Sequence, residues 1–354
     1  MIKNIDIDLV TAKILNMSEG NNLIKNKTKV IKLIIIITLI LMLLFLTFLT
    51  IDRVNNSSDS SVAESNKTMA SSIPSFLTSS FTNTNWEKVD PSIINAQNGG
   101  PGKDGIPALD DPKFVKLDEV TSSNEVQAIV VDNNGSKKVY PYNILIWHEI
   151  VNDTIGDTPV SVTFCPLCGS AIVFERQNMT FGVSGKLFES NLLMYDNLTE
   201  SLWSQSKGEA IVGAKLGKKL SVYQSDIITQ KEAKASFPNA LSLSNKTGIS
   251  RDYSRYPYGD YNESDKLIFP TSVDDKRFHP KTLLYVVPLE KSSIAFVREG
   301  LLKNMTAEKN GVEIKVMENE TIQASKDGYI IPGYIEMWFS WSTHHQDDGF
   351  VWIN

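Results

Sequence analysis

A long apolar run near the N-terminus restricts where the rest of this chain can fold. Residues 33–51 read LIIIITLILMLLFLTFLTI and carry no charge. The run has nineteen residues, and a helix that rises about 1.5 Å per residue then spans the hydrocarbon core of a membrane. We therefore expect a transmembrane helix over residues 33–51, with the membrane as its partner.

The charges around this run predict its orientation. Lys25, Lys27, Lys29 and Lys32 precede it, and an excess of positive charge marks the cytoplasmic side. Residues 1–32 are therefore expected in the cytoplasm, and the main domain is expected to be extracytoplasmic. A cleaved signal peptide is the alternative, but such peptides have a shorter apolar region and a small-x-small cleavage site, which TFLTIDRV does not offer. We favour an uncleaved signal-anchor in a single-pass protein.

The next segment has the composition of a flexible linker. Residues 52–85 are rich in Ser, Asn and Thr, so they bury little apolar surface and are expected to form a disordered stalk. A single exported globular domain, residues 86–354, is expected to follow. Many Asn-x-Ser/Thr sequons fit an exported glycoprotein. They begin at Asn55, Asn56, Asn66, Asn134, Asn152, Asn178, Asn197, Asn245, Asn262, Asn304 and Asn319.

The composition narrows the classes of partner. Hydrophobic residues make up 42% of the chain and charged residues 21%, which is ordinary for a globular protein. The net charge is −6, and the sequence shows no basic stripe, so nucleic acid is not expected as a partner. The composition does not identify a protein or glycan partner.

Alternating apolar patterns predict an α+β domain in which strands predominate. VQAIVV and KKVY flank the turn signal DNNG and predict a hairpin. VSVTF, AIVF and GYIIPGYIEMWFSW also read as strands. Two helices are expected. One lies in PYNILIWHEIVND, where Ile144, Trp147, His148 and Val151 share a face. The other lies in TQKEAKASF, where Thr229 and Glu232 form a capping box.

The chain has two cysteines, Cys165 and Cys168, both within TFCPLCGSAIVF. A metal site of four cysteines within one chain is therefore excluded. His148 lies on the inward face of its expected helix and is the leading third ligand, with a core histidine hydrogen-bonded to the backbone as an equal alternative. Met194 is a candidate fourth ligand, although a methionine in an apolar run more often packs in the core. Two thiolates and an imidazole suit copper or zinc. The metal site predicted from these residues is Cys165, Cys168 and His148.

Two alternatives for the cysteine pair stay open at this point. A structural disulfide suits an oxidising compartment, but it closes a very short loop and gains little stability from loop entropy. Active thiol–disulfide exchange is the other alternative. Thioredoxin-like proteins place such a pair at the start of a helix, which lowers a thiol pKa. Here AIVFER follows the pair and reads as a strand, which weakens the thioredoxin comparison.

Other polar clusters carry weaker signals. STHHQDD contains His344, His345, Asp347 and Asp348, and it is expected to be a solvated turn. RDYSRYPYGDY brings four tyrosines together, which can stack on a sugar or a partner protein, or fold back on their own domain. His279 lies in RFHP and has no partner that the sequence identifies. No nucleophile elbow, phosphate-binding loop or H-E-x-x-H motif is present.

Several segments together resemble a known family. GGPGKDGIPALDDPKF, WHEIVND, CPLCG, FGVSGKLFESNLLMYDNLTESLWSQ, SRDYSRYPYGDY and the closing MWFSW come in the order and spacing of a bacterial and archaeal family. It is known only as a domain of unknown function, number three-one-seven-nine. The resemblance spans roughly residues 99–345 and includes neither the anchor nor the stalk. It implies that His148, Cys165 and Cys168 belong to the family's own motifs. It implies no reaction, substrate or cofactor.

These expectations lead to three functional hypotheses. The first is a membrane-anchored metal-binding protein that serves in metal handling or electron transfer. The second is an enzyme, a thiol–disulfide oxidoreductase that uses the same cysteine pair. The third is a surface interaction protein in which the tyrosine-rich segment binds a glycan or a partner and the cysteines form a staple.

Overall fold

The computed structural model describes residues 38–40, 42–43, 73–132, 135 and 137–353. The expected cytoplasmic segment 1–32 lies outside these residues, as do most of the expected transmembrane helix 33–51 and the expected linker as far as residue 72. Within the described ranges, no helix is long and apolar enough to cross a membrane.

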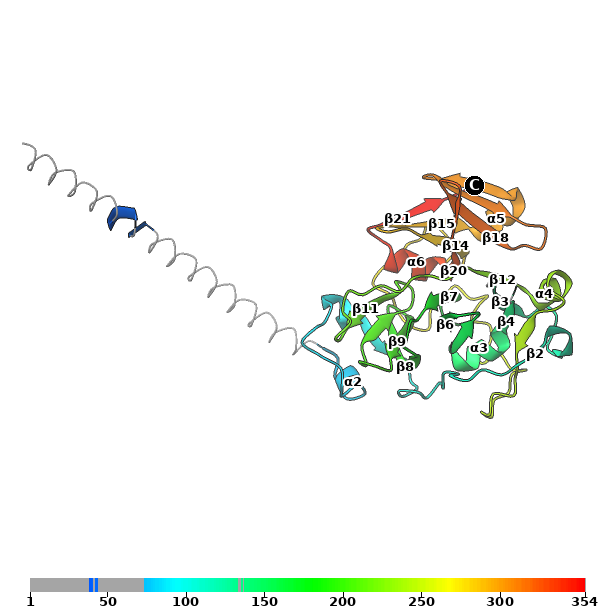
Figure 1. Cartoon of the computed structure of the whole chain (residues 1–354), viewed down its shortest axis with the longest axis horizontal. Coiled ribbons are helices and arrows are strands. Elements are labelled where there is room, and N and C mark those ends of the chain that lie inside the picture. Colours follow the sequence, from blue (N-terminus) through cyan, green and yellow to red (C-terminus); the bar gives the residue numbers. More distant parts are fainter. Residues whose placement is uncertain (1–37, 41, 44–72, 133–134, 136, 354) are drawn as a thin grey trace, which may run out of the picture. The chain divides into compact units, whose positions relative to one another are not determined.

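Four β-sheets and a few short helices build the domain, which confirms a β-rich fold (Figure 1). The central sheet has seven strands. Its order is β21 (Gly349–Trp352), β15 (Ser293–Val297), β14 (Leu283–Pro288), β20 (Tyr334–Met337), β7 (Ser170–Glu175), β6 (Thr158–Cys165) and β5 (Ile150–Ile155). Neighbouring strands are antiparallel except for β15 and β21, which are parallel.

Three smaller sheets surround the central one. Sheet 1 has the order β1 (Ala96–Asn98), β8 (Phe181–Phe188), β9 (Asn191–Asp196), β10 (Leu202–Ser204) and β11 (Glu209–Val212). Sheet 2 has the order β12 (Ser225–Thr229), β3 (Gln127–Val131), β4 (Lys138–Pro141), β13 (Leu241–Leu243) and β2 (Phe114–Lys116). Sheet 3 has the order β16 (Thr306–Lys309), β17 (Val312–Val316), β18 (Ile322–Lys326) and β19 (Tyr329–Ile331). Sheet 1 touches the central sheet where β8 meets β5, and sheet 2 touches it where β12 meets β7 and β20.

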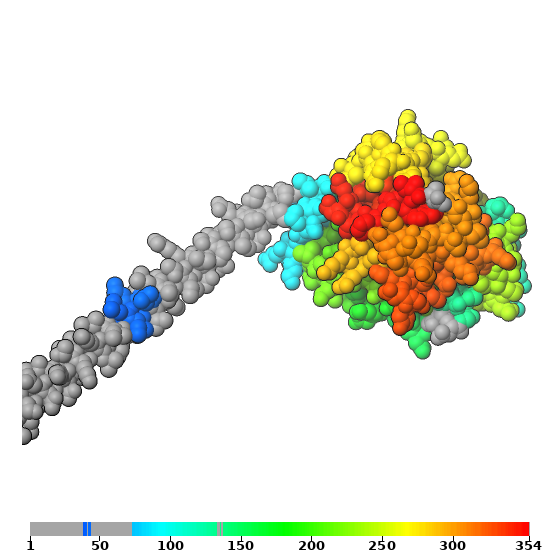
Figure 2. Space-filling model, turned by 90° about the horizontal axis from the view of Figure 1, so that it is seen from above, coloured from blue at the N-terminus to red at the C-terminus, as the bar shows by residue number. Residues whose placement is uncertain are grey.

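The helices of the domain are short, and all but the first directly follow a strand. They are α2 (Ser75–Thr78), α3 (Tyr142–His148), α4 (Gln230–Ser236), α5 (Arg298–Asn304) and α6 (Trp338–His344), with short 3-10 segments at Pro91–Asn95 and Leu117–Glu119. Figure 2 shows the C-terminal residues, in red, between the yellow loop region around residues 250–280 and the orange strands of sheet 3.

Side chains of the central sheet divide between two cores. Along β6, Val162 and Phe164 belong to one buried cluster, whereas Cys165 belongs to another. On β7, Val173 joins the first cluster and Ile172 the second. Because successive strand residues point to opposite faces, these clusters cover opposite sides of the sheet. This double burial explains the apolar run AIVF in β7 and the burial of Ser161 and Thr163 between the apolar residues of β6.

Several local predictions are confirmed. VQAIVV and KKVY form the antiparallel hairpin β3–β4, with Val131 opposite Lys138. VSVTF and AIVF form β6 and β7. The Thr229 side chain caps α4 by accepting from the backbone N–H of Glu232 at 3.2 Å, as the capping-box pattern predicts.

The helix expected in PYNILIWHEIVND is shorter than predicted. It covers only Tyr142–His148, and Glu149 ends it in the left-handed region at φ +57°. The β-branched Ile150 and Val151 then start strand β5, which pairs with β6. The expected apolar face was wrong at Val151, because pairing with a central strand overrides helical periodicity there.

The closing segment was also predicted only in part. Strand β20 covers Tyr334–Met337, but the following residues form helix α6, which begins at Trp338. His344 ends α6 and is buried, with its Nδ1 2.8 Å from the Ser340 carbonyl. The solvated turn expected for STHHQDD is therefore wrong at His344.

The asparagine of one expected glycosylation sequon, Asn152, is buried and hydrogen-bonded inside the domain. The Asn152 amide donates to an Asp110 carboxylate oxygen at 2.7 Å and to the Phe181 carbonyl at 2.8 Å. Its oxygen accepts from the Ser161 hydroxyl at 2.6 Å. Asn152 is fully buried, so the folded domain has no room for a glycan there.

The packed domain begins before residue 86, the boundary expected from composition. Leu77 and Phe81 are fully buried in a cluster with side chains of sheet 1. The Phe81 ring lies 5.5 Å from the Tyr195 ring, and its carbonyl accepts from the Trp86 indole N–H at 2.9 Å. Scattered aromatic and aliphatic residues in the Ser-rich segment therefore anchor residues 73–85 to the fold.

We predict that Phe81→Ala lowers the free energy of unfolding by about 3–5 kcal/mol, because it leaves a cavity in this cluster. The matched control is Ile94→Ala, since Ile94 is an apolar side chain that is 60% exposed and its loss costs less than about 0.5 kcal/mol. Urea unfolding of both variants measures the difference. Equal effects would show that residues 73–85 are not part of the fold.

Candidate functional site

The two cysteines lie at the tip of the hairpin formed by β6 and β7. Cys165 ends β6 and pairs with Ser170, which begins β7. The Cys168 backbone N–H donates to the Cys165 carbonyl at 3.2 Å and closes the turn. Gly169 has φ +54°, and a Cβ there would lie 3.1 Å from the Met337 side chain. This position therefore requires glycine for both its conformation and its close packing.

Both cysteines are free thiols. The pair is 3.6 Å apart, whereas a disulfide joins its sulfurs at about 2.05 Å. Cys165 is 2% exposed and Cys168 is fully buried. Among the described residues the structure thus holds a buried dithiol in place of the disulfide that was one expectation.

The two thiols have opposite electrostatic environments. Burial raises the pKa of Cys165, but hydrogen bonds from the Cys168 thiol and from the backbone N–H groups of Cys168, Leu192 and Leu167 outweigh it and leave this pKa below its ordinary value. Burial raises the pKa of Cys168 well above its ordinary value, and the Cys165 sulfur adds to this. Cys165 is therefore the thiol that ionises first, and Cys168 keeps its proton.

A carboxyl group lies beside Cys165. Glu149 is buried at the end of α3, in the left-handed conformation that ends the helix. Burial raises the pKa of Glu149 well above its usual range, and the charge of Cys165 raises it further. A negative charge on Cys165 therefore disfavours a second negative charge on Glu149. Backbone strain and a shifted pKa at one residue are features of functional sites.

A second carboxyl group, that of Glu336, is connected to Cys168 through Ser340. The Ser340 hydroxyl donates to Glu336 Oε1 at 2.6 Å and also interacts with the Cys168 thiol. Burial raises the pKa of Glu336, although the Ser340 hydrogen bond partly opposes this. Its other oxygen, Oε2, is buried and has no hydrogen-bond partner among the described residues. A hydroxyl thus connects the second thiol to a carboxyl that can take up or release a proton.

The tyrosine-rich segment covers the turn. The Tyr261 hydroxyl donates to the Leu167 carbonyl at 2.9 Å, in the middle of CPLC. Lys281 Nζ donates to the carbonyls of Tyr261, Ser264 and Lys266 and lies 3.6 Å from the centre of the Tyr261 ring. Of the alternatives for RDYSRYPYGDY, the segment folds back on its own domain at Tyr261.

His148 does not face the sulfurs in the way the metal hypothesis required. Its Nδ1 lies 2.8 Å from the Pro107 carbonyl and its Nε2 2.8 Å from the Tyr253 hydroxyl. Because a carbonyl only accepts, Nδ1 carries the proton and Nε2 accepts from Tyr253. Burial lowers the pKa of His148, against the opposing effect of the Pro107 carbonyl. The ring is therefore neutral, and both of its nitrogens are engaged.

The sheet explains this separation. Helix α3 packs on the cluster that contains Val162 and Phe164, whereas Cys165 and Cys168 belong to the cluster on the other face. Over the described ranges, no group of three or more His, Cys, Asp or Glu side chains is placed to hold a metal ion. The three expected ligands therefore do not form such a group in the described residues, and metal binding by this chain stays a prediction.

The other candidate side chains have structural partners. Met194 is fully buried in the same cluster as the cysteines, as its packing alternative predicts. His345 Nδ1 lies 3.0 Å from an Asp348 carboxylate oxygen. His279 Nδ1 accepts from the backbone N–H of Lys281 at 3.2 Å.

Sequence reasoning missed Glu149, Glu336 and Ser340. Glu149 is adjacent to the chosen His148 in WHEIVND, and attention to the inward helical face excluded it. Glu336 is the only charged residue in GYIIPGYIEMWFSW. A charge inside such an apolar run marks a buried ionisable group and was the available signal.

The comparisons with known proteins identify a family without an assigned activity. No curated protein and no solved structure matches this chain. A family model described as "Protein of unknown function (DUF3179)" matches residues 103–328, which include the CPLCG turn, Glu149 and the tyrosine-rich segment. This match covers more than half of the chain and confirms the resemblance seen in its motifs. The chain belongs to the DUF3179 family.

Proposed function

We propose that this domain is a dithiol redox protein in which Cys165 and Cys168 alternate between a dithiol and a disulfide. One observation carries the proposal: two free, buried thiols lie 3.6 Å apart, and their pKa values are shifted in opposite directions. On oxidation, a small movement of the two sulfurs towards each other would be enough to form the disulfide within the existing turn. This is the oxidoreductase hypothesis, without the thioredoxin helix.

The chemistry follows from the pKa differences. The Cys165 thiolate attacks one sulfur of a partner disulfide and releases the partner's other sulfur as a thiolate. Cys168 then gives up its proton through Ser340 towards Glu336, attacks Cys165 in the mixed disulfide, and releases the second partner thiolate. Two electrons pass to the partner, which becomes a dithiol once it is protonated. Because both sulfurs are buried, the tyrosine-rich segment must open for a protein disulfide to reach Cys165.

Metal binding is the second candidate. The backbone N–H groups that lower the pKa of Cys165 would equally stabilise a thiolate bound to copper or zinc. His148 is not available as a third ligand, since both of its ring nitrogens are hydrogen-bonded. The remaining ligands would have to come from a partner or from a rearrangement of the turn.

We also propose that the domain is extracytoplasmic and anchored by residues 33–51. Four described side chains of this run, Leu39, Ile40, Met42 and Leu43, are helical, apolar and more than half exposed. A helix with exposed apolar side chains suits a lipid environment, and the preceding lysines favour an inside N-terminus.

The redox proposal predicts a reversible two-electron transition between about −300 and −120 mV. The protein is equilibrated in thiol–disulfide buffers of graded potential, and its free thiols are counted by alkylation after unfolding and mass spectrometry. Cys165→Ser and Cys168→Ser should each abolish the transition.

Two results would contradict this prediction. One is a pair that stays reduced in strongly oxidising buffers, and the other is a bridge that resists reduction down to potentials below about −300 mV. Stoichiometric copper or zinc in the reduced protein, lost from both serine variants, would favour the metal candidate instead.

A second prediction concerns Glu149. The charge of Cys165 raises the pKa of Glu149, so Cys165→Ser, which removes that charge, should move the ionisation of Glu149 to lower pH. The infrared band of the protonated carboxyl, assigned by its loss in Glu149→Gln and followed during a pH titration of the reduced protein, measures this. Glu175→Gln is the matched control because Glu175 is exposed at the other end of β7, and it should keep this band. A band that titrates identically in wild type and Cys165→Ser would remove Glu149 from the site.

The anchoring proposal predicts that the full chain stays with membranes after alkaline extraction. Protease added to intact cells should digest the domain. Deletion of residues 33–51 serves as the control and should release the protein from the membrane fraction. A wild-type domain that is protected in intact cells and exposed only after lysis would contradict the orientation.

A further inference from the structure

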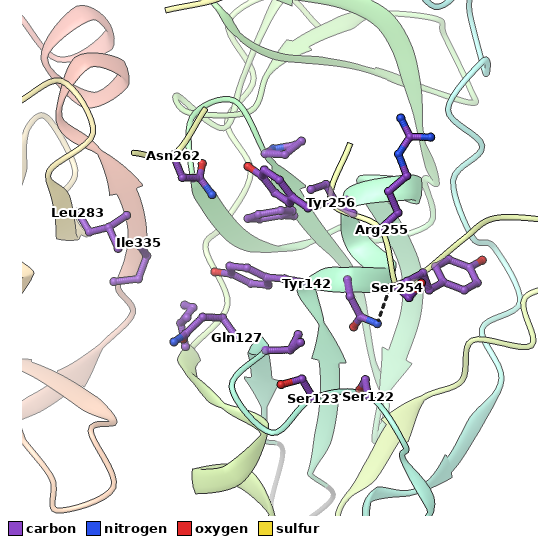
Figure 3. A pocket seen from close by; sticks show the side chains of 18 of the residues that line it. Ser122, Ser123, Gln127, Tyr142, Ser254, Arg255, Tyr256, Asn262, Leu283 and Ile335 are labelled. Atoms are coloured by element: carbon purple, nitrogen blue, oxygen red, sulfur yellow. Dashed lines mark hydrogen bonds between the residues drawn. The ribbon is translucent and has the colours of Figure 1, made fainter. Parts of the chain in front are cut away.

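A cavity of about 790 Å³ opens on the side of the cysteine turn formed by Pro166 and Gly169. Figure 3 shows Tyr142 and Gln127 on one side of it and Leu283 and Ile335 on the opposite side. The volume lies within the range of small-molecule sites. The cavity is distinct from the sulfurs, since neither cysteine lines it.

An aromatic platform forms part of the wall. The Tyr142 ring lies on the Phe164 ring, with centroids 4.1 Å apart and planes inclined by 31°. Phe164 is held rigidly in β6, so the platform rests on the central sheet. Tyr253 and Tyr256 of the tyrosine-rich segment add two further rings. A stacked, immobile ring offers its face to a flat ligand ring at little entropic cost.

His148 has a role in this wall. Its Nε2 accepts from the Tyr253 hydroxyl, which in turn lies 2.7 Å from the Thr247 hydroxyl. The Asn143 amide donates to the Tyr253 carbonyl at 3.2 Å. These bonds fix Tyr253 against α3. The inward histidine of WHEIVND therefore positions Tyr253 in the cavity wall.

The charge of the lining has one sign. Arg255, Lys281 and Arg298 line the cavity, and no Asp or Glu of the described part of the chain does, although the whole chain carries a net charge of −6. Lys281 is occupied by three backbone carbonyls. Arg298 makes a single long contact, 3.5 Å, with the half-exposed Glu320. Its guanidinium is thus only weakly paired and can offer its remaining N–H groups to an anion.

The lining also contains an unused acceptor. Asn143 Oδ1 is buried and has no hydrogen-bond partner among the described residues. A buried acceptor without a donor costs about 1–3 kcal/mol, which a ligand hydroxyl or N–H would recover. The wall therefore combines a flat aromatic face, a weakly paired cation and an acceptor that needs a donor.

We propose that this cavity binds a small organic anion whose ring stacks on Tyr142, whose carboxylate pairs with Arg298, and whose hydroxyl or N–H reaches Asn143. The inference goes beyond the redox function and does not depend on it. Aromatic and sugar rings share this chemistry, so both are used as probes.

Calorimetric titration of the full chain in detergent tests the proposal with 4-hydroxybenzoate, glucuronate and the neutral 4-hydroxybenzyl alcohol. At least one of the two anions should bind saturably and at least about ten-fold more tightly than the alcohol, because a charge-assisted hydrogen bond is lost with the neutral probe. Which anion binds more tightly identifies the ring. Failure of both anions to bind would overturn the proposal, as would equal binding of the neutral probe.

Variants separate the parts of the site. Arg298→Gln should weaken binding of the anion by about ten-fold or more, whereas Glu320→Gln, which removes only the partner of Arg298, should keep or strengthen it. Tyr142→Phe keeps the ring and should bind, and Tyr142→Ala should not. Circular dichroism and thermal unfolding verify that each variant is folded. Unchanged affinity in folded Arg298→Gln would overturn the assignment. The Cys165→Ser variant should bind normally, so failure of the redox proposal leaves this test intact.

Discussion

The burial of the β6–β7 hairpin on both faces is the constraint on which the rest of the structure depends. Each face of this hairpin carries its own apolar cluster, so every residue of the turn at its tip must be accommodated within a close-packed interior. Such a turn cannot leave polar groups unpaired. The Cys165 sulfur accepts from backbone N–H groups, the Cys168 thiol donates to the Ser190 carbonyl at 3.2 Å, and the Leu167 carbonyl accepts from Tyr261. The chemistry of the thiols is thus a consequence of packing.

Polar side chains inside the same interior show how this constraint is satisfied elsewhere. Gln205 donates to the Thr163 hydroxyl at 2.9 Å and accepts from the Ser170 hydroxyl at 2.5 Å. Asn191 donates to the same Gln205 oxygen at 3.0 Å. These hydrogen bonds connect Thr163 of β6 and Ser170 of β7, the strands next to the cysteine turn, to Gln205 and Asn191. Glu149 and Glu336 differ, because burial raises their pKa values. Fully paired polar groups fix the hairpin, and the incompletely compensated carboxyls are the groups to which the redox proposal assigns proton transfer.

Sequence patterns predicted the parts of the fold that depend on local chemistry. The hairpin β3–β4, the cap at Thr229 and the strands around the cysteines required only turn residues and alternation. The end of α3 at Glu149 was not predictable in this way, since a non-glycine residue in the left-handed region pays a local cost that tertiary pairing offsets. The expected grouping of His148 with the two cysteines is not found, for a related reason. Helical periodicity made His148 inward-facing, but it could not show that the sheet separates this ring from the sulfurs.

The tyrosine-rich segment, residues 251–261, contacts both the cysteine turn and the cavity. Tyr261 is hydrogen-bonded to the turn between the cysteines, whereas Tyr253 and Tyr256 line the cavity. Lys281 holds one end of the segment by donating to the Tyr261 carbonyl, and His148 holds Tyr253 at the other end. Because the segment is held at both ends, we expect it to move as one unit. Any opening that exposes Cys165 would therefore also disturb the cavity wall, and a ligand that stabilises the wall would slow access to the thiols.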